Sequence, residues 1–148
     1  MTNPDQATSY LEPTQDSGRA FVMRRMTGNV VMLNLLRFCE TADFSKTPEL
    51  APEAAISGAA AFQRHIEYTL PYLRETGGVL LFLGTSGPFL IGPPTECLDL
   101  AMLVRQHSVE SFLAFASHEA YLAGIGHRTT AIEDSRLLPL SEVGAAMV

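Results

Sequence analysis

One stretch of the chain, Asn29–Phe38, constrains the fold more than any other. Successive side chains of a β-strand point to opposite faces, and here both faces would carry large apolar groups. Asn34 and Arg37 are the only strongly polar interruptions, and a regular strand places them on opposite faces. The sequence therefore predicts a strand that is covered on both sides and carries two polar side chains that could mark a pocket.

The composition limits the class of protein. The chain has 148 residues, of which 47% are hydrophobic, and this suits one domain with a sizeable core. Its net charge of −6 argues against nucleic acid or an acidic membrane as the main partner, because both require clustered lysine and arginine. No apolar run reaches the ~20 residues of a membrane helix, and the polar N-terminus lacks the core of a signal peptide. Cys39 and Cys97 form no Cys-x-x-Cys motif, so we expect reduced thiols in a cytoplasmic protein.

The chain divides into an arm, a domain and a tail. We expect residues 1–28 to form a polar arm, loose over Met1–Leu11, followed by an accessory helix over about Thr14–Met26. Residues 29–140 should form a single domain and residues 141–148 a tail.

Within the domain, two helices are predicted. The first is capped by Ser57, carries an apolar stripe at helical spacing and ends at Gly77–Gly78. The second is capped by Ser108, with a break and restart at Ser117–Glu119. His127–Asp134 is expected to be a polar connection.

Four strands are predicted from apolar alternation. Pro139 should keep the last strand at the edge of the sheet or make the strand end early. The long connection Cys39–Ile56 could be a lid or could contain a short extra helix at about Pro52–Ile56. The predicted strands are Asn29–Phe38, Val79–Thr85, Leu98–Arg105 and Ser135–Leu140.

The order of the elements is β-α-β-β-α-β, the ferredoxin-like α+β pattern with an antiparallel sheet. Two helices can cover only one face of such a sheet, yet at least three of the strands are apolar on both sides. Leaving about eight large side chains exposed would forfeit on the order of 12–24 kcal/mol, which is comparable to or above the ~5–15 kcal/mol net stability of a typical domain. We therefore expect a homodimer in which the two sheets cover each other.

Six short segments occur in this order along the chain and together resemble a bacterial family: Met32–Phe38, Ser57–Gly58, Gly77–Gly78, Leu90–Pro93, His127–Arg128 and Asp134–Leu137. Together they are similar to the proteins catalogued as domain of unknown function thirteen-thirty, in the dimeric α+β barrel superfamily, over roughly Tyr10 to Leu140. The resemblance implies a ferredoxin-like protomer and a barrel made by two sheets, but no activity. Wider relatives include cofactor-free monooxygenases, muconolactone isomerases and haem-dependent chlorite dismutases, and these are analogies of fold only.

The chain departs from that family at three positions. Leu98–Asp99 stands where a Trp-Asp pair commonly begins the third strand. His65 replaces a frequent tyrosine, and His107 replaces a proline before the cap of the second helix. If these positions line a pocket, its shape and acid–base character differ from those of the family.

Polar residues within apolar elements are the candidate site. Asn34 could orient a ligand, or its amide could be satisfied by neighbouring backbone. Arg37 could clamp a carboxylate, or it could pair with Asp99 or Glu40.

The candidate catalytic residues are His65 and Asp99. His65 borders the apolar stripe of its helix, one turn from Tyr68, and could act as a general base or simply be half-buried. Asp99 interrupts an apolar strand and could form an acid–base pair with His65 or a salt bridge with Arg136, Arg128 or Arg37. Tyr68 is grouped with the ligand-binding candidates.

His127 and Arg128 follow a predicted helix end and could cap carbonyl groups or bind an anion. The histidines show no His-x-x-x-His or Glu-x-x-His spacing, so no metal site and no cofactor are expected.

Three functions remain open. The first is a cofactor-independent enzyme for proton transfer, isomerisation or oxygenation of a small oxygenated metabolite. The second is a non-catalytic dimeric binding or sensing module, and the third is a purely structural protein.

Overall fold

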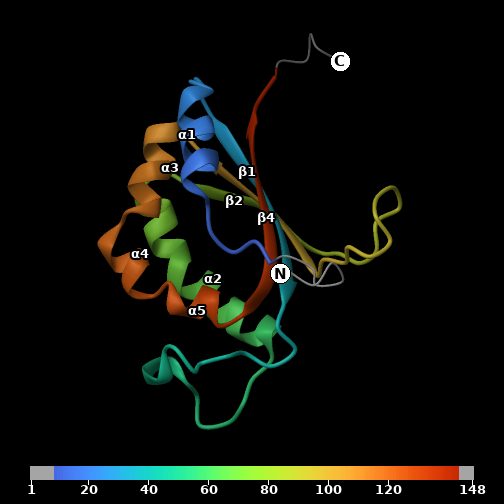
Figure 1. Cartoon of the computed structure of the whole chain (residues 1–148). Helices are drawn as coiled ribbons and strands as arrows, with labels where there is room; N and C mark the ends of the chain where they lie inside the picture. The colour runs from blue at the N-terminus through green and yellow to red at the C-terminus, as the bar shows by residue number, and fades with distance from the viewer. Residues whose placement is uncertain (1–8, 144–148) are drawn as a thin grey trace.

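The doubly apolar stretch forms β1 (Val30–Phe38), an inner strand of one antiparallel sheet (Figure 1). The structure is a computed structural model that describes residues 9–143. The strands lie in the order β2-β3-β1-β4, so β4 is at an edge, where Pro139 was predicted to place it. This order, with helices between β1 and β2 and between β3 and β4, is the ferredoxin-like fold. The other strands are β2 (Val79–Thr85), β3 (Leu100–Gln106) and β4 (Ile132–Ser141).

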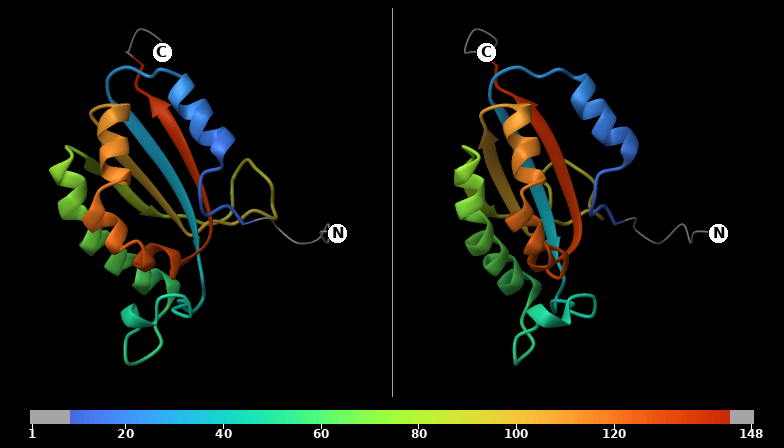
Figure 2. Two further views of the ribbon diagram at one scale, coloured as in Figure 1. Left: turned by 60° about the vertical axis from the view of Figure 1, so that its left-hand side comes forward. Right: turned by 90° about the vertical axis from the view of Figure 1, so that its left-hand side faces the viewer.

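The helices lie on one face of the sheet, as Figures 1 and 2 show. The predicted caps are confirmed: the side chain of Ser57 accepts a hydrogen bond from the backbone N–H of Ala60, and that of Ser108 accepts one from Ser111. The predicted break of the second helix is also present. The helices are α1 (Gln15–Met23), α2 (Gly58–Glu75), α3 (Val109–Ala116), α4 (Glu119–Ala123) and α5 (Gly126–Thr129).

The core lies between the helices and one face of the sheet. Leu36 of β1 packs with Phe62 and Ile66 of α2, and Val30 and Met32 pack against Val109 of α3. The β1 residues in these contacts alternate along the strand, so one phase of β1 faces the helices.

The second phase of β1 lies on a face that none of the described helices covers. We call this surface the open sheet face. It includes Phe82 and Leu138, which are 55% and 53% exposed. The strand register places the following residues on it: Val31, Leu33, Leu35, Phe82, Ala101, Leu103, Leu138 and Leu140.

Two short segments differ from what the sequence suggested. The predicted polar connection His127–Asp134 instead contains α5 and the start of β4, because Ala131 and Ile132 are drawn into the core. No helix forms at Pro52–Ile56, because the backbone of Ile56 bonds to Ala42 and a neighbouring bridge holds the segment extended. The connection has only the 3-10 helix η1 (Pro48–Leu50).

The N-terminal arm is held at Tyr10 and Leu11, a region that was predicted to be loose. The backbone N–H of Tyr10 donates to Asp134, and the carbonyl of Leu11 accepts from Arg128. Residues 1–8 of the arm and 144–148 of the tail lie outside the described residues. Within the described part of the chain, no helix is long and apolar enough to cross a membrane.

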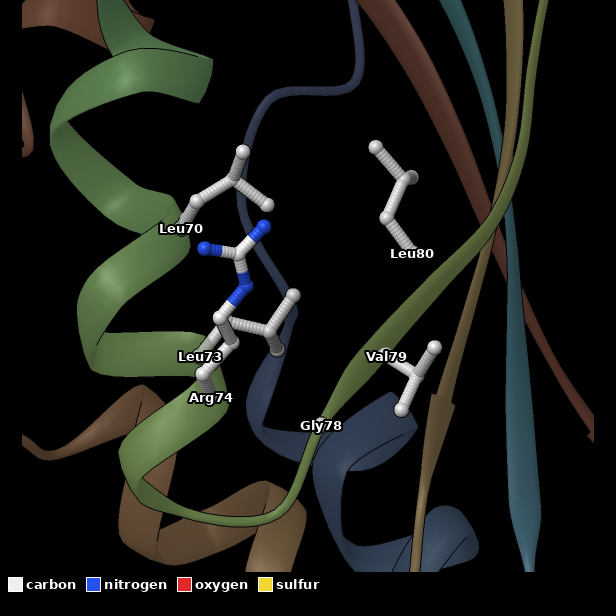
Figure 3. A pocket seen from close by; sticks show the side chains of 6 residues that line it. All are labelled: Leu70, Leu73, Arg74, Gly78, Val79 and Leu80. Atoms are coloured by element: carbon white, nitrogen blue, oxygen red, sulfur yellow. The ribbon is translucent and has the colours of Figure 1, made fainter.

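A hollow of ≈ 240 Å³ lies between α2 and the edge strand β2 (Figure 3). Its walls are mostly apolar, and none of the candidate residues from the sequence lines it. The lining residues are Leu70, Leu73, Arg74, Gly78, Val79 and Leu80.

Candidate ligand-binding site

A second hollow, of ≈ 280 Å³, lies where β1 ends and β4 begins, and we call it the Arg37 pocket. Arg37 and Asp134 are direct cross-strand partners in the sheet register, and Arg136 lies two residues further along β4 on the same face. The N-terminal arm and the loop between β2 and β3 close the sides. The lining residues are Tyr10, Arg37, Pro93, Thr95, Glu96, Asp134 and Arg136.

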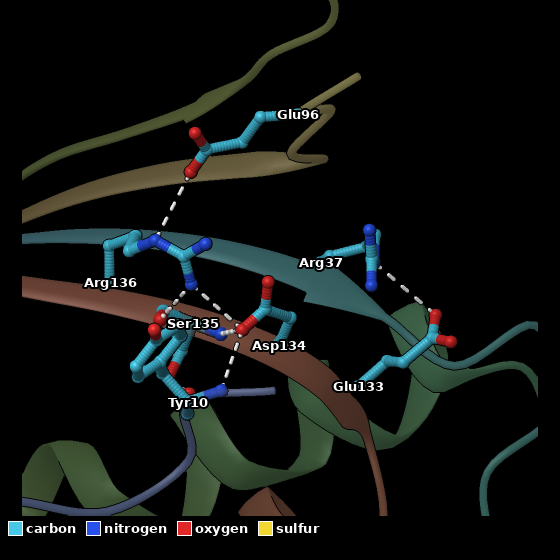
Figure 4. A network of polar contacts seen from close by, with 7 residues as sticks. All are labelled: Tyr10, Arg37, Glu96, Glu133, Asp134, Ser135 and Arg136. Atoms are coloured by element: carbon cyan, nitrogen blue, oxygen red, sulfur yellow. Dashed lines mark hydrogen bonds and ion pairs between the residues drawn. The ribbon is translucent and has the colours of Figure 1, made fainter. Parts of the chain in front are cut away.

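Asp134 is the hub of a polar network (Figure 4). Its Oδ1 accepts hydrogen bonds from Arg136 Nη1 at 2.8 Å, from the backbone N–H of Tyr10 at 2.8 Å and from that of Ser135 at 2.9 Å. Burial alone would raise the pKa of Asp134, but the bonds from Tyr10 and Arg136 outweigh it and lower that pKa. Asp134 is therefore an ionised structural acceptor at neutral pH.

Arg136 is fully engaged by its neighbours. Its Nε lies 3.1 Å from Glu96 Oε1, and its guanidinium carbon lies 4.7 Å from the centroid of the Tyr10 ring. With its bond to Asp134, Arg136 ties the arm and the β2–β3 loop to the sheet. These contacts make Arg136 a framework residue of the pocket.

Arg37 is the loosely held cation of the pocket. Its Nε lies 3.4 Å from Glu133 Oε2, close enough for an ion pair, but it is buried and makes no hydrogen bond to any described residue. Glu133 is 55% exposed, which indicates a weak surface contact. Asp99 and Glu40, the partners considered from the sequence, are not ion-paired with Arg37 within the described residues. The guanidinium of Arg37 is therefore available to an acidic ligand.

Four of the predicted residues gather on the helix side of the sheet instead: His65, Tyr68, His127 and Arg128. The rings of Tyr68 and His127 are 5.5 Å apart, and the ring of His65 is 6.2 Å from that of Tyr121. Tyr68 and Arg128 are engaged by backbone, because each donates a hydrogen bond to a carbonyl group. The cluster packs α2 against α4 and α5.

His65 is buried in this cluster, with 7% of its surface exposed. Burial lowers the pKa of His65 to about 3, and the nearby charges of Arg128 and His127 act in the same direction. Its Nδ1 lies 3.3 Å from Thr69 Oγ1. The imidazole is therefore neutral at physiological pH and is not poised to act as a general base there.

Asp99 and His65 are not brought together. Asp99 is exposed and lies just before β3. It is two residues from Ala101 and so points to the open sheet face, whereas His65 belongs to α2, which covers the opposite face of the sheet. The Oδ2 of Asp99 accepts a hydrogen bond from the backbone N–H of Phe38 at 2.8 Å. The acid–base pair considered from the sequence is therefore not formed.

Asn34 faces the helices, in phase with Met32 and Leu36, and not the Arg37 pocket. Its Nδ2 donates to the carbonyl oxygen of Met32 at 3.2 Å. The amide thus makes the neighbouring backbone contact that was one of its two expected roles. No group of three His, Cys, Asp or Glu side chains that could hold a metal ion gathers among residues 9–143.

Most residues of the Arg37 pocket were not among the candidates predicted from the sequence. Only Arg37 was a candidate, while Asp134 and Arg136 were noted as part of a family motif or as a salt-bridge partner. A signal did exist, because Asp134 and Arg136 alternate along a strand and must share a face. The contribution of Tyr10 could not be seen, since it depends on where the arm crosses the sheet.

Comparisons with known proteins support the fold and identify no activity. No protein-family model and no curated protein sequence matches the chain. Two crystal structures of RPA0582, a protein of unknown function from Rhodopseudomonas palustris, have TM-scores of 0.81 and 0.80 at 27% identity. They cover 94% and 93% of this chain and 98% and 99% of their own. A Caulobacter crescentus protein, provisionally assigned as an antibiotic biosynthesis monooxygenase, has a TM-score of 0.52 at 12% identity. The match covers 84% of this chain and 99% of that protein, and at this identity it shows a common fold and nothing more.

Proposed function

We propose that this chain is a dimeric small-molecule-binding protein of the family catalogued as domain of unknown function thirteen-thirty, and that the Arg37 pocket binds a small oxygenated metabolite through a carboxylate. The observation that carries the proposal is the guanidinium of Arg37, whose buried Nε has no hydrogen-bond acceptor among the described residues. A carboxylate supplies two acceptors in the geometry that a guanidinium fits.

The rest of the pocket suits a small ligand. Arg136 is already held by Asp134 and Glu96, so it shapes the wall without competing for the ligand. Glu133 is mostly exposed and can swing away when a ligand carboxylate takes its place. The volume of ≈ 280 Å³ is close to the lower limit of ~300 Å³ for typical ligand pockets.

The proposed dimer rests on the open sheet face. Phe82 and Leu138 on this face are more than half exposed in a single protomer, and a second copy related by a two-fold axis would bury both faces at once. The Arg37 pocket lies at one end of this same face, so a dimer would place it beside the interface.

A cofactor-independent enzyme is the second candidate. The observation in its favour is the buried imidazole of His65, which is neutral and lies next to the hydroxyl of Thr69. This candidate has less support than binding. His65 does not meet Asp99, and Asp134 is saturated with donors, so neither supplies a proton-transfer pair at neutral pH.

Calorimetric titration with benzoate and pyruvate tests the binding proposal. We expect saturable binding, weakened roughly tenfold in Arg37→Lys and 10- to 100-fold in Arg37→Met, because a bidentate charge-assisted contact contributes about 1.5–3 kcal/mol. Arg105→Lys is the matched control, since Arg105 lies on the same face next to Val31, which is far along β1 from Arg37. Equal affinity of the wild type and Arg37→Met would refute the assignment.

A further inference from the structure

Gln106 is a buried polar side chain with no function in the proposed site. Gln106 is the last residue of β3 and pairs with Val30, so its side chain points toward the helices. It is 1% exposed. Its Nε2 and its Oε1 are both buried and have no hydrogen-bond partner among the described residues. Buried side-chain amides almost always form hydrogen bonds. An amide whose N–H groups have no acceptor and whose oxygen has no donor therefore calls for an explanation.

The amide of Gln106 lies directly behind the wall of the hollow between α2 and β2. A Cβ atom placed on Gly78 would be 2.9 Å from Gln106 Nε2 and 2.3 Å from Cδ1 of Leu73. Gly78 and Leu73 both line the hollow. Glycine at position 78 thus leaves space for the amide, and a rotation of the Leu73 side chain would open the hollow to it.

The hollow itself is apolar, with one cation at its rim. Leu70, Leu73 and Leu80 face one another across it, and the guanidinium of Arg74 extends beside Leu70 (Figure 3). Arg74 is exposed and has no ion pair within residues 9–143. The volume of ≈ 240 Å³ equals that of roughly eight water molecules at ~30 Å³ each.

We propose that this hollow binds a compact apolar molecule that carries a carboxamide group. The carboxamide would pair with Gln106, its oxygen accepting from Nε2 and its N–H donating to Oε1, and the apolar part would lie along Leu70 and Leu80. A carboxylate fits less well, because it has only hydrogen-bond acceptors and would leave Oε1 of Gln106 without a donor. The site is independent of the Arg37 pocket, since Gln106 lies opposite the first residue of β1 and Arg37 is near the last.

Hexanamide is the probe, with hexanoate for comparison. In the ¹⁵N-labelled protein we expect hexanamide to shift the side-chain NH₂ resonances of Gln106 in a saturable way, and hexanoate to bind more weakly. Gln106→Met should weaken hexanamide binding about tenfold or more, since it removes two hydrogen bonds while keeping the shape of the side chain. Leu80→Phe places a larger side chain in the hollow and should abolish the binding of hexanamide. Leu83→Phe, on the same strand but outside the hollow, should leave the binding unchanged.

The thermal stability of the unliganded variants separates this role from a structural one. If Gln106 awaits a ligand, Gln106→Met should leave the melting temperature unchanged or raise it, because no bond is lost. A lower melting temperature for Gln106→Met would show that Gln106 already has partners, such as ordered water, and would overturn the proposal. Failure of hexanamide to bind, or equal binding to Gln106→Met, would overturn it as well.

Discussion

Leu138→Glu is expected to dissociate the proposed dimer into monomers. Leu138 is 53% exposed on the open sheet face, directly across from Leu33 of β1, so its replacement leaves the protomer core intact. In a two-fold dimer the new carboxylate of each copy would be buried without a cation to pair with. This should weaken the free energy of association by about 3–5 kcal/mol. The dimer dissociation constant should rise by a factor of at least about 100, which sedimentation velocity at micromolar concentration would measure.

The neighbouring residue provides the matched control. Leu137 is 47% exposed but points to the opposite face of β4, toward the helices. Leu137→Glu adds the same charge one position away, so it should leave the dimer intact. A wild-type protein that sediments as a monomer would contradict the dimer proposal, and so would an equal effect of the two substitutions.

The fold was predictable because the strongest signals in the sequence are local. The apolar alternation of β1 and the caps Ser57 and Ser108 depend only on neighbouring residues. The predicted β2 strand matches the structure, and β3 begins two residues later than predicted. Edge placement of β4 was one of the two outcomes expected from Pro139, whose missing N–H is tolerated at a sheet edge.

The segment between α4 and β4 was not predictable in the same way. Its polar residues outnumber its apolar ones, so local pattern favoured a loop. Ala131 and Ile132 are nevertheless almost fully buried, because the chain must return to the sheet beneath α2. A register shift beside Phe38 then changes the pairing of β4, and no local pattern reveals such an irregularity.

The site shows the same division. Arg37 could be singled out because a charge inside an apolar strand needs a reason. Its surroundings depend on the pairing of β1 with β4 and on two distant loops, which the sequence does not specify. The His65–Asp99 pair failed for a related reason, since the sheet separates a residue of α2 from one on the open sheet face.

His65 should make the protein sensitive to mild acid. Its pKa falls from 6.5 to about 3 on folding, chiefly through burial. Between these values the unfolded chain binds a proton that the folded chain does not, so the free energy of unfolding decreases as the pH falls. At pH 4.5 the loss relative to pH 8 that comes from His65 should be on the order of 3 kcal/mol. This part should disappear in His65→Gln, which keeps a polar partner for Thr69, whereas the loss from His127, whose pKa burial also lowers, should remain.

Urea unfolding of both proteins at the two pH values and at one protein concentration would measure this loss. Asp134 also loses stabilisation in acid, but its pKa is lowered from 3.8, so its contribution disappears below the pH range compared here. The exposed His107 provides the control, because His107→Gln should retain the full pH dependence of the wild type. If His65→Gln and the wild type lost equal stability at pH 4.5, His65 would not be held neutral by burial, and its rejection as a general base would have to be withdrawn.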